Sequence, residues 1–241
     1  MPQMPRDKAA VAGWLQATLQ GRKDYYKGRN EQWLQDRALL LQAYKTPILD
    51  FPNIMSAEPR NMVRLAQDIM AAREPRFTVV IHDQETIEQD RMNDSERFFY
   101  GLYREADRRH RQLGNRSIAR DIDWYVLMGG YALQPVAERG PDGTEFRVRV
   151  LDPKDVFPLY DQDGLAWVCH AYETTGYAAK GRAWRNATAG WTPQAIEALK
   201  DEDDVEVGNY FWLEEDGVYN AVLVDGKEVK PPTRHREYRR R

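Results

Sequence analysis

The sequence predicts an α+β fold in which N-terminal helices are followed by a mostly antiparallel β-sheet. Three observations lead to this prediction. Apolar residues recur at helical spacing in the first half of the chain, and short alternating stretches rich in β-branched and aromatic residues fill the second half. Turn-forming Gly, Pro and Asp separate those stretches. Helices and strands that are segregated along a chain are typical of the α+β class.

The N-terminal third is predicted to be helical. Asp7 can cap a first helix whose apolar stripe ends at Leu19, and Gly21 and Gly28 weaken the helix beyond it. We therefore expect a second helix over about residues 30–44. A third helix begins at Pro59 and carries an amphipathic stripe, which consists of Met62, Val63, Ala66, Ile69 and Met70.

The middle of the chain is predicted to contain one strand and two helices. Residues 77–81 are rich in β-branched side chains and predict the strand. A long helix over about residues 85–113 follows, with arginines crowded on its polar face. Ser117 can cap the next helix, which ends at Gly129-Gly130.

The second half is predicted to consist of strands joined by turns. A Gly-Pro-Asp-Gly turn separates strands at 131–137 and 146–150, and Asp225-Gly226 is a hairpin signal. Thr192-Pro193 starts a short helix. Acidic residues 201–204 form a solvated loop. Further strands are expected at 165–173, 207–214 and 218–224.

The composition indicates a folded protein that does not coat nucleic acid. Of the 241 residues, 42% are hydrophobic and 30% charged, and seven Trp and thirteen Tyr are too many for a solvated tail. A net charge of -3 argues against a general nucleic-acid-coating protein, which is usually basic. Cys169 is the single cysteine, so no internal disulfide forms, and no stretch approaches the ~18 apolar residues of a membrane span. We expect a soluble protein of a reducing compartment.

Catalytic and cofactor motifs are absent from the sequence. It contains no H-E-x-x-H, P-loop, G-x-S-x-G or G-x-G-x-x-G pattern, and none of its four histidines stands at metal-ligand spacing. His82 follows a predicted strand and is interpreted as a solvated strand end. Cys169 and His170 are neighbours in a predicted strand, so they should face opposite sides and form no nucleophile and base pair. We expect no catalytic, cofactor or metal residues.

Two charged features keep alternative functions open. A metal-dependent nuclease or hydrolase would use a carboxylate cluster with His82 or His170. The carboxylates in question are Asp121, Asp123, Asp152, Asp155, Asp161 and Asp163. A DNA-binding accessory protein would use the basic C-terminus, where we expect nucleic-acid or partner contact at Arg234, Arg236, Arg239, Arg240 and Arg241.

A second basic region covers residues 104–120. Its arginines either form a solvated helix face, paired with Glu105 and Asp107, or contact an acidic partner. These arginines are Arg104, Arg108, Arg109, Arg111, Arg116 and Arg120.

Several segments, in their order, resemble the portal proteins of tailed bacteriophages. Residues 121–136 read DIDWYVLMGGYALQPV and precede the Gly-Pro-Asp-Gly turn; VRVLDP at 148–153 and DVFPLYD at 155–161 follow. Upstream, residues 56–83 are also similar, with a helix that contains Asn61 and then REPRF at 73–77 leading into a strand. The resemblance covers roughly residues 36–173.

The resemblance implies a non-enzymatic structural subunit that needs no cofactor. Portal proteins form a ring, usually a dodecamer, at one capsid vertex of the virion, after assembly in the host cytoplasm. Double-stranded DNA passes through this ring during packaging and ejection. The implied partners are further copies of the chain, the major capsid protein and scaffold, the terminase large subunit and a head-tail adaptor, with no membrane involved.

The resemblance also implies a domain organisation. Residues 1–55 would be an N-terminal helical region, 56–230 an α+β domain like the portal wing, and 231–241 a basic segment that leads toward a stem. Portal proteins continue with a stem, a clip and a tunnel helix. Since this sequence stops at Arg241, we expect either a partial chain or a shortened relative.

Overall fold

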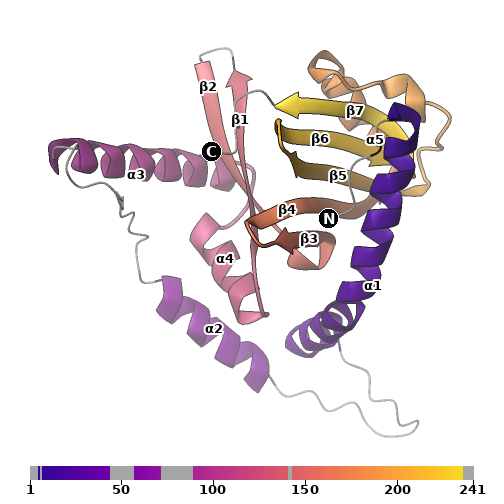
Figure 1. Cartoon of the computed structure of the whole chain (residues 1–241). Coiled ribbons are helices and arrows are strands. Elements are labelled where there is room, and N and C mark those ends of the chain that lie inside the picture. Colours follow the sequence, from indigo (N-terminus) through magenta and orange to yellow (C-terminus); the bar gives the residue numbers. More distant parts are fainter. Residues whose placement is uncertain (1–4, 6, 44–56, 72–88, 141–142, 236–241) are drawn as a thin grey trace, which may run out of the picture. The chain divides into compact units, whose positions relative to one another are not determined.

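The computed structural model describes residues 5, 7–43, 57–71, 89–140 and 143–235 (Figure 1). Among these residues it contains five α-helices and two antiparallel sheets, with helices predominating in the first half, so the predicted α+β class is confirmed. Within the described residues, no helix is both long and apolar enough to cross a membrane.

The chain forms two compact units. Residues 1–31 and 154–241 make up the first, called here the sheet unit, and residues 32–153 make up the second, called the helical unit. The expected boundaries at residues 55 and 230 do not coincide with this division. The reason is that the N-terminal helix packs on strands from the end of the chain, so the sheet unit is discontinuous in sequence.

The sheet unit is a five-stranded antiparallel meander with helices on both faces (Figure 1). Its strands lie in sequence order as β3 (Val156–Asp161), β4 (Gly164–Thr175), β5 (Asp204–Glu214), β6 (Gly217–Val224) and β7 (Lys227–His235). Helix α1 (Lys8–Leu40) covers one face, and α5 (Gly176–Arg185) with the short 3-10 helix η3 (Pro193–Ile196) covers the other.

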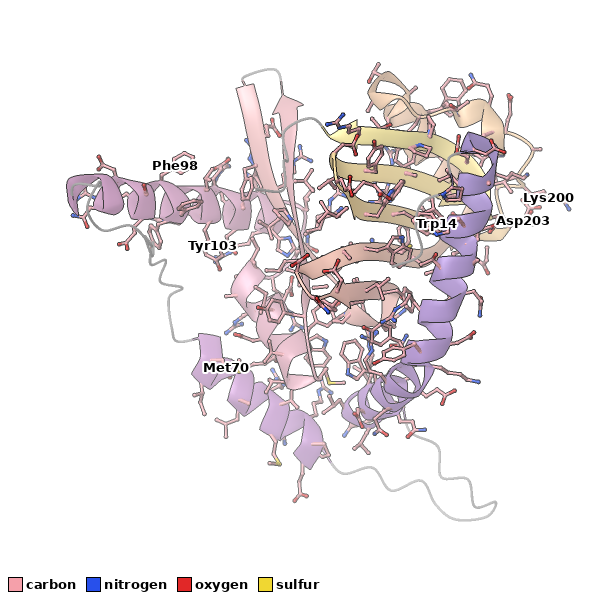
Figure 2. All side chains as sticks on the ribbon, in the orientation of Figure 1. Trp14, Met70, Phe98, Tyr103, Lys200 and Asp203 are labelled. Carbon is pink, nitrogen blue, oxygen red and sulfur yellow. The ribbon has the colours of Figure 1, made fainter. Side chains whose placement is uncertain are left out.

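The α1 face of this sheet is closed by large aromatic side chains. Leu15 is buried against Trp167 and Trp212, and Trp14 meets Trp212 edge to face at 5.8 Å between ring centroids. Figure 2 shows Trp14 on α1 beside the sheet. On the opposite face, small residues of α5 such as Ala183 let the helix approach a layer of valines. Both faces of the sheet are therefore buried.

The helical unit combines three helices with one β-hairpin. Helix α3 (Gln89–Gln112) packs on strand β2 (Gly143–Leu151), and α2 (Glu58–Ala71) packs on α4 (Ile118–Leu127). Strand β1 (Ala132–Gly140) pairs antiparallel with β2, with Gly140 opposite Gly143. Ser117 caps α4, as predicted, because its hydroxyl oxygen accepts a hydrogen bond from the Arg120 amide at 3.3 Å.

Five elements differ from the prediction or fall outside the described residues. Helix α1 runs unbroken through Gly21 and Gly28, where a break was expected. Strands β3 and β7 and helix α5 were not predicted, and β7 includes residues 231–235 of the expected C-terminal segment. The predicted strand at 77–81 lies outside the described residues.

Candidate functional site

Cys169 and His170 of β4 form no nucleophile and base pair. Cys169 and His170 face opposite sides of β4, as predicted, because Cys169 belongs to the α1 layer while His170 stacks on Tyr172 of the α5 layer, 4.9 Å between ring centroids. Burial raises the pKa of the Cys169 thiol well above its usual range. The thiol is therefore an inert core group and not a nucleophile.

The carboxylates of the nuclease alternative serve local structure. Asp152 forms an ion pair with Arg37 at 2.9 Å, and Asp155 forms one with Lys154 at 2.8 Å. Asp161 accepts a hydrogen bond from the Asp163 amide in the turn between β3 and β4. Among the described residues, no three Asp, Glu, His or Cys side chains are grouped so that they could hold a metal ion.

The predicted C-terminal contact residues are described only in part. Arg234 lies in β7 and forms an ion pair with Asp216 at 3.2 Å. Residues 236–241, which include Arg236, Arg239, Arg240 and Arg241, lie outside the described part of the chain, as does His82.

Comparison of the chain with models of known protein families, and with curated proteins, gives no match.

The helical unit contains two adjoining pockets lined with arginine, together called here the arginine groove. The larger pocket has a volume of about 860 Å³ and lies among α3, α4, β2 and the end of α1. The smaller one, of about 400 Å³, lies between α2 and α4. Leu41, Arg116 and Trp124 line both pockets, so the two pockets adjoin at these residues.

Arginines from five separate segments point into this groove. The sequence singled out the region 104–120 as basic, and Arg109, Arg116 and Arg120 of that region line the groove. Arginines that sequence reasoning missed come from α1, α2 and β2. They are Arg37, Arg60, Arg64, Arg147 and Arg149. Among the lining residues only Asp68 and Asp121 are carboxylates, so the groove is strongly basic.

Ion pairs hold part of this arginine set in position. Glu145 of β2 binds both Arg109 and Arg147, and these guanidinium groups lower the pKa of its carboxyl. Glu105 of α3 pairs with Arg108 and Arg109, whose hydrogen bonds lower its pKa to about 2. These pairs attach the end of α3 to the hairpin. They also fix the direction of the Arg109 side chain.

A histidine and carboxylate pair forms one wall of the larger pocket. His110 Nε2 lies 2.7 Å from Asp121 Oδ2, and the His110 side chain is only 10% exposed. Asp107 accepts a hydrogen bond from the Ile118 amide at 2.7 Å and forms an ion pair with Arg111, so it connects the start of α4 to α3. Both contacts join residues eleven positions apart, across the turn at Gly114. The wall is rigid for this reason.

Proposed function

We propose that this chain is a structural subunit of a ring built from copies of itself, of the kind that portal proteins form at a capsid vertex of tailed bacteriophages. In that role the ring conducts double-stranded DNA during packaging and ejection. It also presents surfaces to the capsid protein and scaffold, the terminase and the head-tail adaptor. The chain itself performs no catalysis.

One observation carries the proposal: the helical unit leaves its apolar side chains unburied. Of the twenty-three buried apolar residues among the described part of the chain, only Leu40, Ala106 and Ile118 belong to this unit. Of the seventeen large apolar residues that are exposed there, twelve belong to it. Exposed apolar side chains that gather into a patch mark sites of association.

Helix α2 gives the clearest part of this surface. Met62, Leu65 and Ile69 are 71%, 63% and 61% exposed and lie at positions i, i+3 and i+7, on one face of the helix. The half-buried side of α2 is formed instead by Val63, Ala66 and Met70 with the buried Gln67. The apolar face of α2 is therefore broad, and only part of it packs within the chain.

A second apolar patch lies on α3, where Phe98 and Phe99 are exposed and contact each other edge to face (Figure 2). A closed ring needs two different patches on each subunit, because its interfaces are heterologous. Helices α2 and α3 offer two such patches within one unit. The order of α4, two glycines, the β1–β2 hairpin and Pro153 agrees locally with the segments that carry the portal resemblance.

The size of the assembly tests the proposal. We expect mass photometry and negative-stain microscopy of the purified chain to show closed rings of one size. Replacing the outer face of α2 with charge (Leu65→Asp with Ile69→Asp) should dissociate them. The matched control, Tyr177→Asp with Trp184→Asp, places two charges seven residues apart on exposed positions of α5 and should leave the rings intact.

Two outcomes would contradict the proposal. One is a chain that stays monomeric at every concentration with its circular dichroism intact. The other is a ring that the α5 pair disrupts as strongly as the α2 pair does, since that would place the interface on the sheet unit.

A further inference from the structure

We propose that the arginine groove binds a single strand of nucleic acid, with phosphates on its arginines and a base on Trp124. This inference goes beyond the ring, since it concerns a binding site within one unit of one chain. It rests on the charge of the groove, on its aromatic residue and on its concave shape.

The charge of the groove is only partly compensated from within the chain. Glu145 and Asp152 hold Arg109, Arg147 and Arg37, as described above. Three further lining arginines are solvent-exposed and have no hydrogen-bond or ion-pair partner among the described residues. They are Arg60 and Arg64 of α2 and Arg116 of the turn before α4. Exposed guanidinium groups that converge on a concave surface suit the oxygen atoms of phosphate.

Trp124 supplies the second feature that single-strand binding needs. Its half-buried indole lines both pockets, as Arg116 does. Proteins that bind single strands combine a basic groove with aromatic side chains on which bases stack. An indole between two arginine-lined pockets has this arrangement, with phosphates on both sides of one stacked base.

The concavity of the groove selects the form of the nucleic acid. A flexible strand can bend to place neighbouring phosphates in two adjoining pockets. A stiff duplex presents its phosphates on a convex rod and does not enter such a pocket. An acidic polypeptide would meet the same arginines but would make no use of the indole as a stacking surface.

Fluorescence anisotropy with a labelled oligothymidylate tests the inference. All variants should carry glutamine in place of Arg236, Arg239, Arg240 and Arg241, so that the C-terminal arginines contribute no binding. We expect saturable binding. The logarithm of the association constant should fall linearly with the logarithm of the salt concentration. Arg116→Glu should weaken it by about tenfold or more, because an arginine to phosphate contact is lost and a repulsion is added.

The aromatic contact has its own pair of variants. Trp124→Leu should weaken binding by about fivefold or more, whereas Trp124→Phe, which keeps a stacking surface, should lose much less. Arg185→Glu, an exposed arginine of α5 in the sheet unit, is the control for overall charge and should stay within about twofold of the parent. Thermal melts show whether each variant is folded. Arg116 is exposed and without a partner among the described residues, so its variant should melt like the parent.

Three results would overturn the inference. The first is the absence of saturable binding, or binding that Arg116→Glu does not weaken. The second is tighter binding of a duplex of the same length, which would show that the arginines bind DNA on an open surface and not within the groove. The third is competition by polyglutamate as effective as that by unlabelled oligothymidylate, together with no effect of Trp124→Leu, since this would identify an acidic polypeptide as the occupant.

Discussion

Two glycines of α5 should respond in opposite directions to the same substitution. Gly176 is the first residue of the helix and is buried under the loop that carries Lys200 and Asp203 (Figure 2). Its amide donates to the Asp203 carbonyl oxygen at 2.8 Å, and the Tyr177 amide donates to the Asp201 carbonyl oxygen at 3.1 Å. These two backbone bonds attach the acidic loop to the start of the helix.

Gly176→Ala should break this attachment. A Cβ atom on Gly176 would lie 3.1 Å from the Lys200 carbonyl carbon and closer still to its oxygen, nearer than side chains approach backbone in real structures. The obstacle is backbone, so the loop itself must move. Overpacking costs about 1–3 kcal/mol and each lost hydrogen bond about 0.5–1.5 kcal/mol. We therefore expect a loss of about 2–6 kcal/mol in the free energy of unfolding.

Gly181→Ala is the matched control. It lies inside the same helix, and the nearest atom to its added Cβ is an Arg185 side-chain nitrogen at 3.9 Å, an ordinary contact. Alanine should therefore stabilise the protein by about 0.5–1 kcal/mol. Urea denaturation followed by tryptophan fluorescence and circular dichroism measures both variants. A Gly176→Ala protein as stable as the parent would refute the reasoning, as would equal destabilisation by the two substitutions.

Three further predictions concern the sheet unit. Leu15→Ala, at a position 1% exposed, should cost about 2–5 kcal/mol. Its control, Leu34→Ala, lies on the part of α1 that belongs to the helical unit, is 56% exposed and should stay within about 0.5 kcal/mol in the same denaturation experiment. Cys169 should resist a thiol reagent at pH 8 in the native protein and react once the protein is denatured. Because its folded pKa is raised, its contribution to stability should fall as pH rises above the unfolded value of about 8.5. Burial lowers the pKa of Lys230, whose ammonium group donates to Asn220 Oδ1 at 2.5 Å. The unfolded chain then binds more protons at this site, so wild type should gain stability relative to Lys230→Met as pH rises toward 10.5.

Elements with strong local signals were predictable from the sequence. Ser117 and the glycines at 129 and 130 enclose α4, and Asp225 and Gly226 form their hairpin turn with the positive φ angles of 46° and 74° that this turn requires. In each case the signal and the structure that it specifies lie within a few residues of each other. These elements can be located in the sequence without knowledge of tertiary contacts.

Elements that depend on tertiary contacts were missed. Helix α1 continues through Gly21 and Gly28 because each glycine costs only about 1 kcal/mol, less than the packing of its apolar stripe on the sheet contributes. Pro231 and Pro232 argue against a strand, yet β7 accommodates them because it is the edge of the sheet. Helix α5 has a small buried surface of alanines, and no apolar stripe reveals it.

The arginine groove shows the same limit at the level of a site. The sequence revealed the basic stretch around Arg116, because its arginines are close together in the chain. It did not reveal that Arg64 of α2 and Arg147 of β2 line the same groove, since neither stands in a basic run. Convergence of distant segments is decided by packing, and a single sequence contains no direct signal of it.

The two units differ in how much apolar surface they expose, and this difference indicates which unit should form the interface of the proposed ring. The sheet unit buries both faces of its sheet and has little apolar surface left to offer. The helical unit buries few apolar residues among those described and exposes the α2 and α3 patches, so the proposed ring would use side chains that the folding of the unit leaves exposed. Charged substitutions there should weaken assembly, while the tryptophans around Trp212 report an intact sheet unit. If every variant that dissociates the assembly also exposes those tryptophans to quencher, the sheet unit and not the α2 face supplies the interface.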